Sequence, residues 1–176
     1  MKKGFSLIET LVATAIIVLA AVGPLRMAGT SLSQANYIKD QIVATFLAQE
    51  GLEIMRNIRD SSDITAIGNL KSLCGGSNSC TVSGIDSHNT GYEVTQCTNN
   101  ACPTLDYDTE NNLYCYKTQG KEKCPGQNVS SIFTRTVTIQ EVVPGSEYKV
   151  HSLIQWKRGY GPRTIELTEN LFKRTW

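Results

Sequence analysis

The chain has 176 residues, of which 40% are hydrophobic and 19% are charged. This length supports one domain with a core plus an accessory element, and it argues against two full domains. The formal net charge of +1 excludes a strong field that would draw in nucleic acid or an anionic membrane, so the charge says nothing more about partners.

The first predicted element is an apolar helix at the N-terminus. Residues 5–25 would span about 30 Å as a helix, which is enough to cross the hydrocarbon core of a membrane. Two lysines precede this run without a compensating acid, so residues 1–4 are expected in the cytoplasm and the chain after Arg26 on the far side of the membrane. Glu9 is the only charge within the run, where an isolated carboxylate is costly.

Three interpretations of this run compete. A cleaved secretory signal peptide rarely carries a glutamate, and its best cleavage context, at 20–23, runs into Pro24, which commonly blocks cleavage. An uncleaved membrane anchor leaves Glu9 equally unexplained. If the chain is instead cut between Gly4 and Phe5, the new α-amino group is a cation one helical turn from Glu9, in the same chain or in a neighbouring subunit. This third interpretation gives the carboxylate a partner.

The string KKGFSLIETLVA resembles the leader and N-terminal motif of type IV prepilins and of type II secretion pseudopilins. In that family the prepilin peptidase, a membrane aspartyl protease, cuts after the glycine and methylates the new N-terminus. The resemblance therefore implies a leader peptide at 1–4, cleavage between Gly4 and Phe5, N-methylation of Phe5 and a role for Glu9 in filament assembly. Two further stretches, AQEGLEIMRNIRD and IQWKRGYGPRTIELTENLF, are similar to the PilV-type branch of minor pilins.

This resemblance implies a structural subunit, and a minor one by its PilV-type stretches, of a type IV pilus or a related secretion or uptake filament. The implied partners are other pilin subunits, the prepilin peptidase and the inner-membrane assembly platform. The subunit would cross the cell membrane once, with its C-terminal part outside the cytoplasm, before it joins a pilus at the cell surface or a periplasmic pseudopilus. The alternative is a monomeric, membrane-tethered or secreted binding module stapled by disulfides.

The helix is expected to continue beyond the membrane segment. Gly23 and Pro24 predict a kink, because the proline removes a backbone donor and crowds the preceding turn. Apolar residues then recur at three- and four-residue spacing and predict an amphipathic helix over 26–60. The helix should end near 60–62, where three short polar residues compete for backbone hydrogen bonds. The apolar positions are Leu32, Ala35, Ile38, Ile42, Phe46, Leu47, Leu52, Ile54 and Ile58.

Residues 61–130 show no sustained periodicity and predict a loop region with short strands at 92–96 and 113–117. Beyond this region apolar and polar residues alternate in three runs, which predict a three-stranded antiparallel meander over 131–176. The apolar face of the meander needs a cover, and the amphipathic helix is the expected cover. The predicted fold is therefore α+β and type IV pilin-like, with a long N-terminal helix packed on a C-terminal antiparallel sheet and residues 26–176 forming one headpiece.

Six cysteines all lie in the polar region between the helix and the meander, at Cys74, Cys80, Cys97, Cys102, Cys115 and Cys124. An even number outside the cytoplasm predicts disulfides, and pairing each cysteine with its nearest neighbour is the simplest of fifteen connectivities. A zinc site is a weaker alternative, because no C-x-x-C motif occurs and the chain has only two histidines. No metal and no other cofactor is expected.

No motif predicts an enzyme, since neither a nucleophile elbow nor a placed catalytic base occurs. The run 106–112 offers oxygen ligands at alternating positions, but Asn111 and Lys117 stand where a calcium loop needs glycine and glutamate, so a solvated acidic turn is favoured. Late basic residues such as Lys157 and Arg163 alternate with acids, which favours a solvated sheet face over one that binds nucleic acid.

Overall fold

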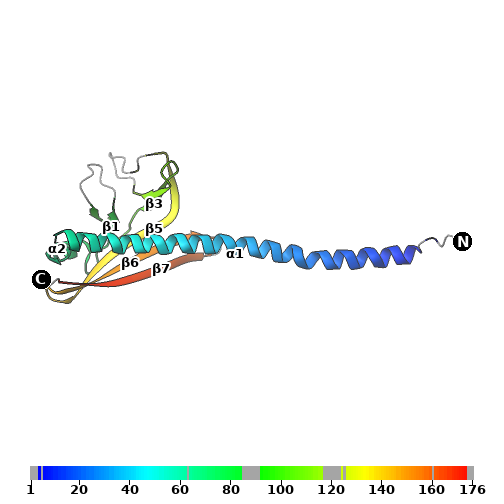
Figure 1. Ribbon diagram of the computed structural model, residues 1–176, viewed down its shortest axis with the longest axis horizontal. Coiled ribbons are helices and arrows are strands. Elements are labelled where there is room, and N and C mark those ends of the chain that lie inside the picture. Colours follow the sequence, from blue (N-terminus) through cyan, green and yellow to red (C-terminus); the bar gives the residue numbers. More distant parts are fainter. Residues whose placement is uncertain are drawn as a thin grey trace. The chain divides into compact units, whose positions relative to one another are not determined.

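Figure 1 shows the chain as a computed structural model. The structure describes residues 4, 6–62, 64–84, 92–116, 124, 126–159 and 161–173. Three parts of the sequence-based predictions lie outside the described residues. They are the leader segment 1–3, Phe5 as the predicted site of cleavage and methylation, and Lys117 at the end of a predicted strand. The chain forms two compact units, Met1–Ile42 and Val43–Trp176, and each is described by itself.

A long N-terminal helix is followed by a short helix and then by antiparallel strands, which confirms the predicted α+β, type IV pilin-like fold. The elements are α1 (Leu7–Ser62), α2 (Ile64–Cys74), β1 (Cys80–Ser83), β2 (Glu93–Gln96), β3 (Thr104–Asp108), β4 (Leu113–Cys115), β5 (Asn128–Val143), β6 (Glu147–Arg158) and β7 (Gly161–Phe172). The last three strands are the predicted meander, and each of them is longer than any strand before it.

Helix α1 continues through Gly23 and Pro24, so the proline lies inside the helix. The kink expected at these two residues stays a prediction. Helix α1 is described as far as Ser62, and its predicted end near 60–62 stays a prediction. The hydroxyl of Ser61 donates to the backbone carbonyl of Ile58 at 3.3 Å, which is the competition for backbone groups expected of short polar residues.

The seven strands of the described residues belong to one antiparallel sheet that is organised around β5. Strand β6 runs along one edge of β5, with Phe133 opposite Trp156, and β7 pairs with the other edge of β6. Strands β1 and β3 share the opposite edge of β5, where β1 meets it at Val137 and β3 meets it at 128–134. On this side of β5, strand β2 pairs with β1 and strand β4 pairs with β3, so β2 and β4 are the edge strands there.

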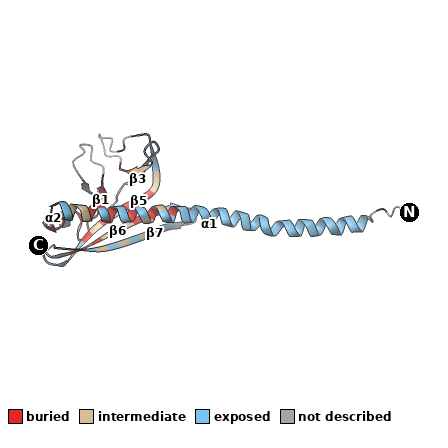
Figure 2. Cartoon of the chain, viewed as in Figure 1, coloured by how far each residue is buried: buried red, intermediate tan, exposed pale blue. Residues whose placement is uncertain are grey.

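The core of unit 2 forms where the C-terminal half of α1 packs on one face of this sheet, as predicted. Alternate residues of β6 are buried, as the two-residue period of a strand requires: Tyr148, Val150, Ser152, Ile154 and Trp156. One cluster of buried side chains includes Met55 and Ile139, and a second includes Leu47 and Ile154. Figure 2 shows buried positions in red on the part of α1 that belongs to unit 2 and on the strands.

The face of α1 that meets the sheet differs in part from the predicted one. Four members of the predicted apolar stripe, Leu32, Ile38, Ile42 and Phe46, are between 51% and 69% exposed. Leu47, Leu52 and Ile54 are buried as predicted, but small residues at 44, 48 and 51 complete the buried face. A Cβ on Gly51 would lie only 2.6 Å from Ser152 Oγ, so the helix backbone approaches the strand closely at this point.

The region 61–130 contains more regular structure than predicted. The loop prediction is wrong for α2, whose single buried face is interrupted by Gly68 and Asn69 and is too short for its periodicity to stand out. It is also wrong for β1, which is buried at all four positions and therefore does not alternate, and for β3, which contains Asp106 and Asp108. Strands β2 and β4 lie within the two predicted strands.

Candidate functional site

The residues assigned to processing and assembly lie at the start of α1. The carbonyl of Ser6 accepts hydrogen bonds from the backbone N–H groups of Glu9 at 3.0 Å and of Thr10 at 3.2 Å, which opens the helix just after the predicted cut. Glu9 is exposed in the first turn, where the helix dipole favours a carboxylate. Gly4 is exposed, and a Cβ added there would meet nothing within 4 Å. A protease can therefore reach the Gly4 backbone, and a partner can reach Glu9.

On both sides of Glu9, the first part of α1 exposes large apolar side chains. Its large exposed side chains are Leu7, Ile8, Leu11, Val12, Ile16, Ile17, Val18, Leu19, Val22, Leu25 and Met27, each at least 42% exposed. An exposed apolar surface of this extent is typical of a membrane or protein contact. Within the described residues, α1 is the one helix long and apolar enough to cross a membrane, although a signal sequence would pass the same test.

The polar side chains of this segment are mostly satisfied within the helix itself. The hydroxyls of Thr10, Thr14 and Thr30 donate to backbone carbonyls three residues earlier at 2.8, 3.0 and 2.9 Å. Such bonds allow a hydroxyl to enter an apolar environment without losing its partner. Glu9 and Arg26 are the two charged side chains of this segment, and each needs a partner from outside the helix.

Three disulfides close the loops of unit 2. They join Cys74 to Cys80, Cys97 to Cys102 and Cys115 to Cys124, with Cα–Cα distances of 5.2, 4.8 and 5.7 Å. This is the nearest-neighbour pairing that the sequence suggests as the simplest. In the part of the chain that the structure describes, no group of three or more histidine, cysteine, aspartate or glutamate residues could hold a metal ion.

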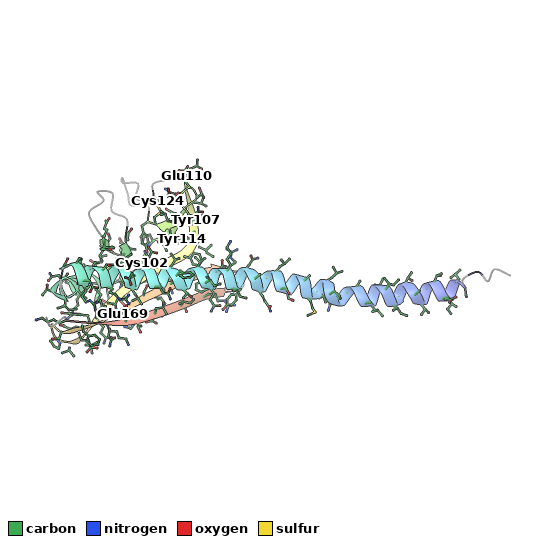
Figure 3. The ribbon with its side chains drawn as sticks, in the orientation of Figure 1. Cys102, Tyr107, Glu110, Tyr114, Cys124 and Glu169 are labelled. Carbon is green, nitrogen blue, oxygen red and sulfur yellow. A yellow bond between two sulfur atoms is a disulfide. The ribbon has the colours of Figure 1, made fainter. Side chains whose placement is uncertain are left out.

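One buried carboxylate, that of Asp108, holds the acidic turn between β3 and β4 in place through a set of hydrogen bonds that we call the clamp. Asp108 is fully buried and accepts hydrogen bonds from the backbone N–H groups of Glu110 at 2.9 Å, Asn111 at 3.1 Å and Gly126 at 2.8 Å, and from Asn111 Nδ2 at 3.0 Å. The expectation of a solvated turn is therefore wrong at this residue. The four donors occupy the carboxylate, so it is not offered to a cation. Figure 3 shows Cys124 near the hairpin that carries Glu110.

The pKa of Asp108 reflects this environment. Burial acts to raise the pKa, but the hydrogen bonds from Asn111, Glu110 and Gly126 outweigh burial and hold the pKa below the usual value for an aspartate. The clamp therefore prefers the ionised carboxylate. It connects the β3–β4 turn to Gly126, two residues after the Cys115–Cys124 disulfide.

Arg135 is a buried cation that was not predicted from the sequence. Its side chain donates from Nη1 to the carbonyl of Leu47 at 3.1 Å and to Glu50 Oε2 at 2.9 Å, and from Nη2 to the carbonyl of Val82 at 2.6 Å. The guanidinium carbon lies 5.8 Å from the centre of the Tyr116 ring. One side chain of β5 thus joins α1 to β1. The signal was available, because the alternation of β5 puts this arginine on the buried face.

Charged residues of the meander pair with one another or with α1. Arg56 of α1 binds both carboxylate oxygens of Glu169 from Nη2, each at 2.8 Å. His151 Nδ1 lies 2.6 Å from Glu166 Oε1 on the neighbouring strand. These pairs support the interpretation of an ordinary charged surface over a cationic patch.

Comparison with known families identifies the N-terminal segment. Residues 1–23 match the prokaryotic N-terminal methylation motif, which is the prepilin-type signal for cleavage and methylation. The match confirms the resemblance carried by KKGFSLIETLVA, while the resemblance of the two later stretches to PilV-type minor pilins stays a prediction. A search of curated proteins and a search of solved structures returned no match. The motif supports an exported protein of the pilin or pseudopilin kind, and it points to a structural protein and not to an enzyme.

Proposed function

We propose that this chain, which carries a prepilin-type methylation motif, is a structural subunit of a type IV pilus or of a related secretion or uptake filament. The prepilin peptidase removes the leader 1–4 and methylates Phe5. Residues 5–25 then hold the subunit in the membrane until the assembly platform passes it into the filament. Residues 26–60 continue the helix, and 26–176 form the headpiece. The assignment to a minor subunit stays a prediction.

The observation that carries this proposal is the match of residues 1–23 to the methylation motif. The structure adds a physical reason, because the same residues open a helix whose apolar side chains are exposed from Leu7 onward. An apolar helix that leaves a bilayer must enter another apolar environment, and a bundle of similar helices provides one. Membrane anchoring and filament assembly can therefore use the same surface in turn.

Glu9 has a definite place in this scheme. A carboxylate that enters a bundle of apolar helices needs a cation, and cleavage after Gly4 creates one at the amino group of Phe5. We assign Glu9 to the Phe5 amino group of a neighbouring subunit. This pairing would fix the register in which each new helix docks.

Peptide mass spectrometry of the membrane and filament fractions tests the proposal. The expected product begins with N-methylated Phe5. A Gly4→Leu variant should remain uncut, because the protease needs close access to the backbone that a glycine leaves open. Gly29→Leu is the matched control, since Gly29 has nothing within 4 Å and lies outside the motif, and this variant should be cut normally.

Two results would contradict the proposal. If wild-type protein in the membrane still begins with Met1, the N-terminal helix is an uncleaved membrane anchor. A first residue beyond Gly23 would identify a secretory signal peptide and would favour the secreted binding module instead.

A further inference from the structure

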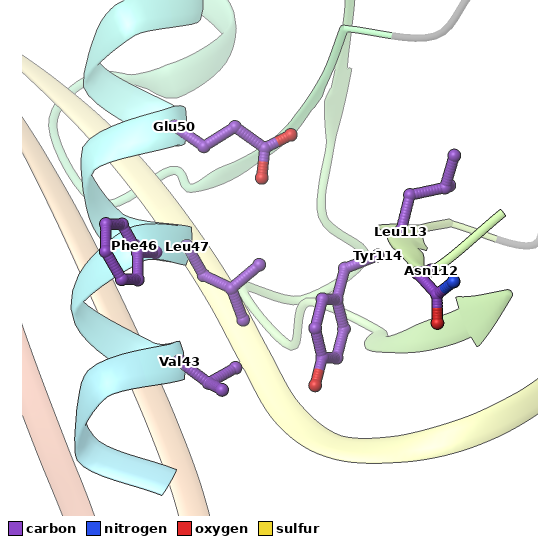
Figure 4. Close-up of a pocket in the computed structure, with 7 residues that line it drawn as sticks. All are labelled: Val43, Phe46, Leu47, Glu50, Asn112, Leu113 and Tyr114. Carbon is purple, nitrogen blue, oxygen red and sulfur yellow. The ribbon is translucent and has the colours of Figure 1, made fainter. Parts of the chain in front are cut away.

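An apolar groove in unit 2 lies between α1 and the β3–β4 hairpin. Its volume is about 430 Å³, and its lining residues are Val43, Phe46, Leu47, Glu50, Asn112, Leu113 and Tyr114. Figure 4 shows Val43 and Leu47 extending from α1 toward Tyr114 on the hairpin. Phe46 lines the groove and is 66% exposed, which is unusual for a phenylalanine within a folded unit. The groove is a surface to which a partner could dock.

A single carboxylate defines the polarity of this groove. The Glu50 side chain is 44% exposed, and its Oε2 accepts a hydrogen bond from Arg135 at 2.9 Å. A carboxylate offers about four acceptor positions, so this one hydrogen bond does not exhaust it. Apolar walls beside a half-exposed carboxylate are complementary to an apolar segment that carries one cation.

The chain itself contains a segment of this kind. Leu25 and Met27 are 72% and 73% exposed, and Arg26 stands exposed between them. Arg26 is the only cation between residue 4 and Lys39. Among the residues that the structure describes, none pairs with its guanidinium group. Within one helix only side chains three or four positions apart face each other, so Arg26 cannot meet Glu50 of its own α1.

We propose that the groove of one copy binds the Leu25-Arg26-Met27 segment of a second copy, with Arg26 paired to Glu50. This inference rests on the proposed function and names the contact between neighbouring subunits. Groove and segment are different surfaces, so the contact is heterologous and repeats from copy to copy without having to close into a dimer. A repeating contact of this kind is what a filament requires.

Site-specific crosslinking of the full chain, in cells that assemble it into filaments, tests this contact. Phe46 is replaced by p-benzoylphenylalanine, a photocrosslinker that keeps an aromatic ring at this exposed position. Two copies with different epitope tags are produced together, so that contacts between copies are distinguished from contacts within one. After illumination, mass spectrometry should find position 46 of one copy joined to a peptide that contains residues 25–27 of the other.

Charge variants then test the proposed ion pair. Arg26→Glu and Glu50→Gln should each lower the yield of this crosslink about fivefold or more, which corresponds to roughly 1 kcal/mol for a partly exposed pair. Glu50→Gln keeps an acceptor for Arg135 but removes the charge beside this buried cation, so the unfolding of the headpiece is measured in the same variant, and its crosslink yield is compared only for folded protein. Lys157→Glu is the control, because it makes the same charge reversal as Arg26→Glu at an exposed position on β6, and it should leave the yield unchanged.

The proposal is overturned by a crosslink to the same copy, to another segment or to another protein, by the absence of any crosslink, or by wild-type yields in both variants. The N-terminal mass of the protein in the same sample reports on the proposed function separately. A subunit that begins with methylated Phe5 but fails the crosslinking test would refute this contact alone.

Discussion

Glu9 is the one carboxylate in the apolar part of α1, and under the proposed function its surroundings change when the subunit passes from the membrane into the filament. In a membrane, removing the charge makes the segment cheaper to insert. In a bundle of helices, removing the charge leaves the amino group of a neighbour to be desolvated alone, at a cost on the order of several kcal/mol before relaxation. The same substitution should therefore have opposite effects on insertion and on assembly.

We expect Glu9→Gln to insert and to be cut as wild type, and then to fail to enter filaments. The measurement is the amount of this subunit in the sheared filament fraction relative to the membrane fraction. Glu93→Gln, which removes a carboxylate from β2 in the headpiece, should assemble normally. Wild-type amounts of Glu9→Gln in filaments would show that the carboxylate does not serve assembly.

Asp108 should make the stability of the headpiece depend on pH. Its pKa is lowered in the folded state by the donors around it, so its ionisation stabilises the fold above the pKa of the unfolded state, which is about 4. This contribution is lost as the pH falls through the lower, folded-state pKa. Asp108→Asn should lower the free energy of unfolding at neutral pH. It should also make this free energy depend less on pH in the acidic range. Chemical denaturation at several pH values measures both effects.

The neighbouring carboxylate supplies the comparison for that experiment. Asp106 lies on the same strand and is partly exposed, so Asp106→Asn should keep the wild-type profile. If Asp108→Asn and wild type lose stability in parallel on acidification, another group is responsible for the acid sensitivity.

At the scale of elements, the packing of α1 on the sheet depends on its small residues. A leucine at position 51 would collide with Ser152. The Cβ of that leucine would also lie 3.3 Å from Cδ of Arg135. We expect Gly51→Leu to lower the free energy of unfolding of the headpiece by about 3 kcal/mol, at the upper end of the range for overpacked cores. Thermal or chemical unfolding of the full chain in detergent measures the loss.

A leucine at Gly29 tests whether the loss comes from packing or from replacing a helical glycine as such. Nothing lies within 4 Å of the Cβ position at Gly29, so Gly29→Leu should leave the unfolding of the headpiece unchanged. Equal losses in the two variants would mean that the close approach at Gly51 does not control stability.

The same contact explains why the sequence misled us about the buried face of α1. Hydrophobic periodicity selects large apolar side chains, and it therefore favoured Phe46 over Ala44 and Ala48. The distance between a helix and a sheet is set by the smallest side chains between them, which a count of apolar residues does not weigh. Phe46 is left outside, where we assign it to a contact between copies.

At the scale of the whole molecule, the sequence predicted the long regular elements and missed the short ones. Strands β5, β6 and β7 are 12 to 16 residues long and contain alternating stretches that are long enough to establish a period. Helix α2 and strands β1 and β3 have 11, 4 and 5 residues, and their burial depends on partners that are distant in sequence. Local patterns carry no information about such partners.

The candidate site divides in the same way. Gly4, Phe5 and Glu9 lie within six positions of one another, so the sequence alone shows that they are neighbours. The match to residues 1–23 supports the motif that they form. The groove joins Val43 and Phe46 of α1 to a hairpin more than sixty residues later, a contact that only the folded chain creates. A motif of neighbouring residues can be recognised in the sequence, whereas a docking surface formed by distant segments can be recognised only in the folded chain.

The positions of the disulfides also decide how the headpiece carries a mechanical load. The bridges span only six, five and nine positions, all six cysteines are used, and none lies in α1. Tension that enters through α1 therefore reaches the sheet through side-chain packing, the hydrogen bonds of Arg135 and the Arg56–Glu169 ion pair, with no disulfide across that contact. We therefore expect the contact between α1 and the sheet to separate under load before any disulfide is stretched.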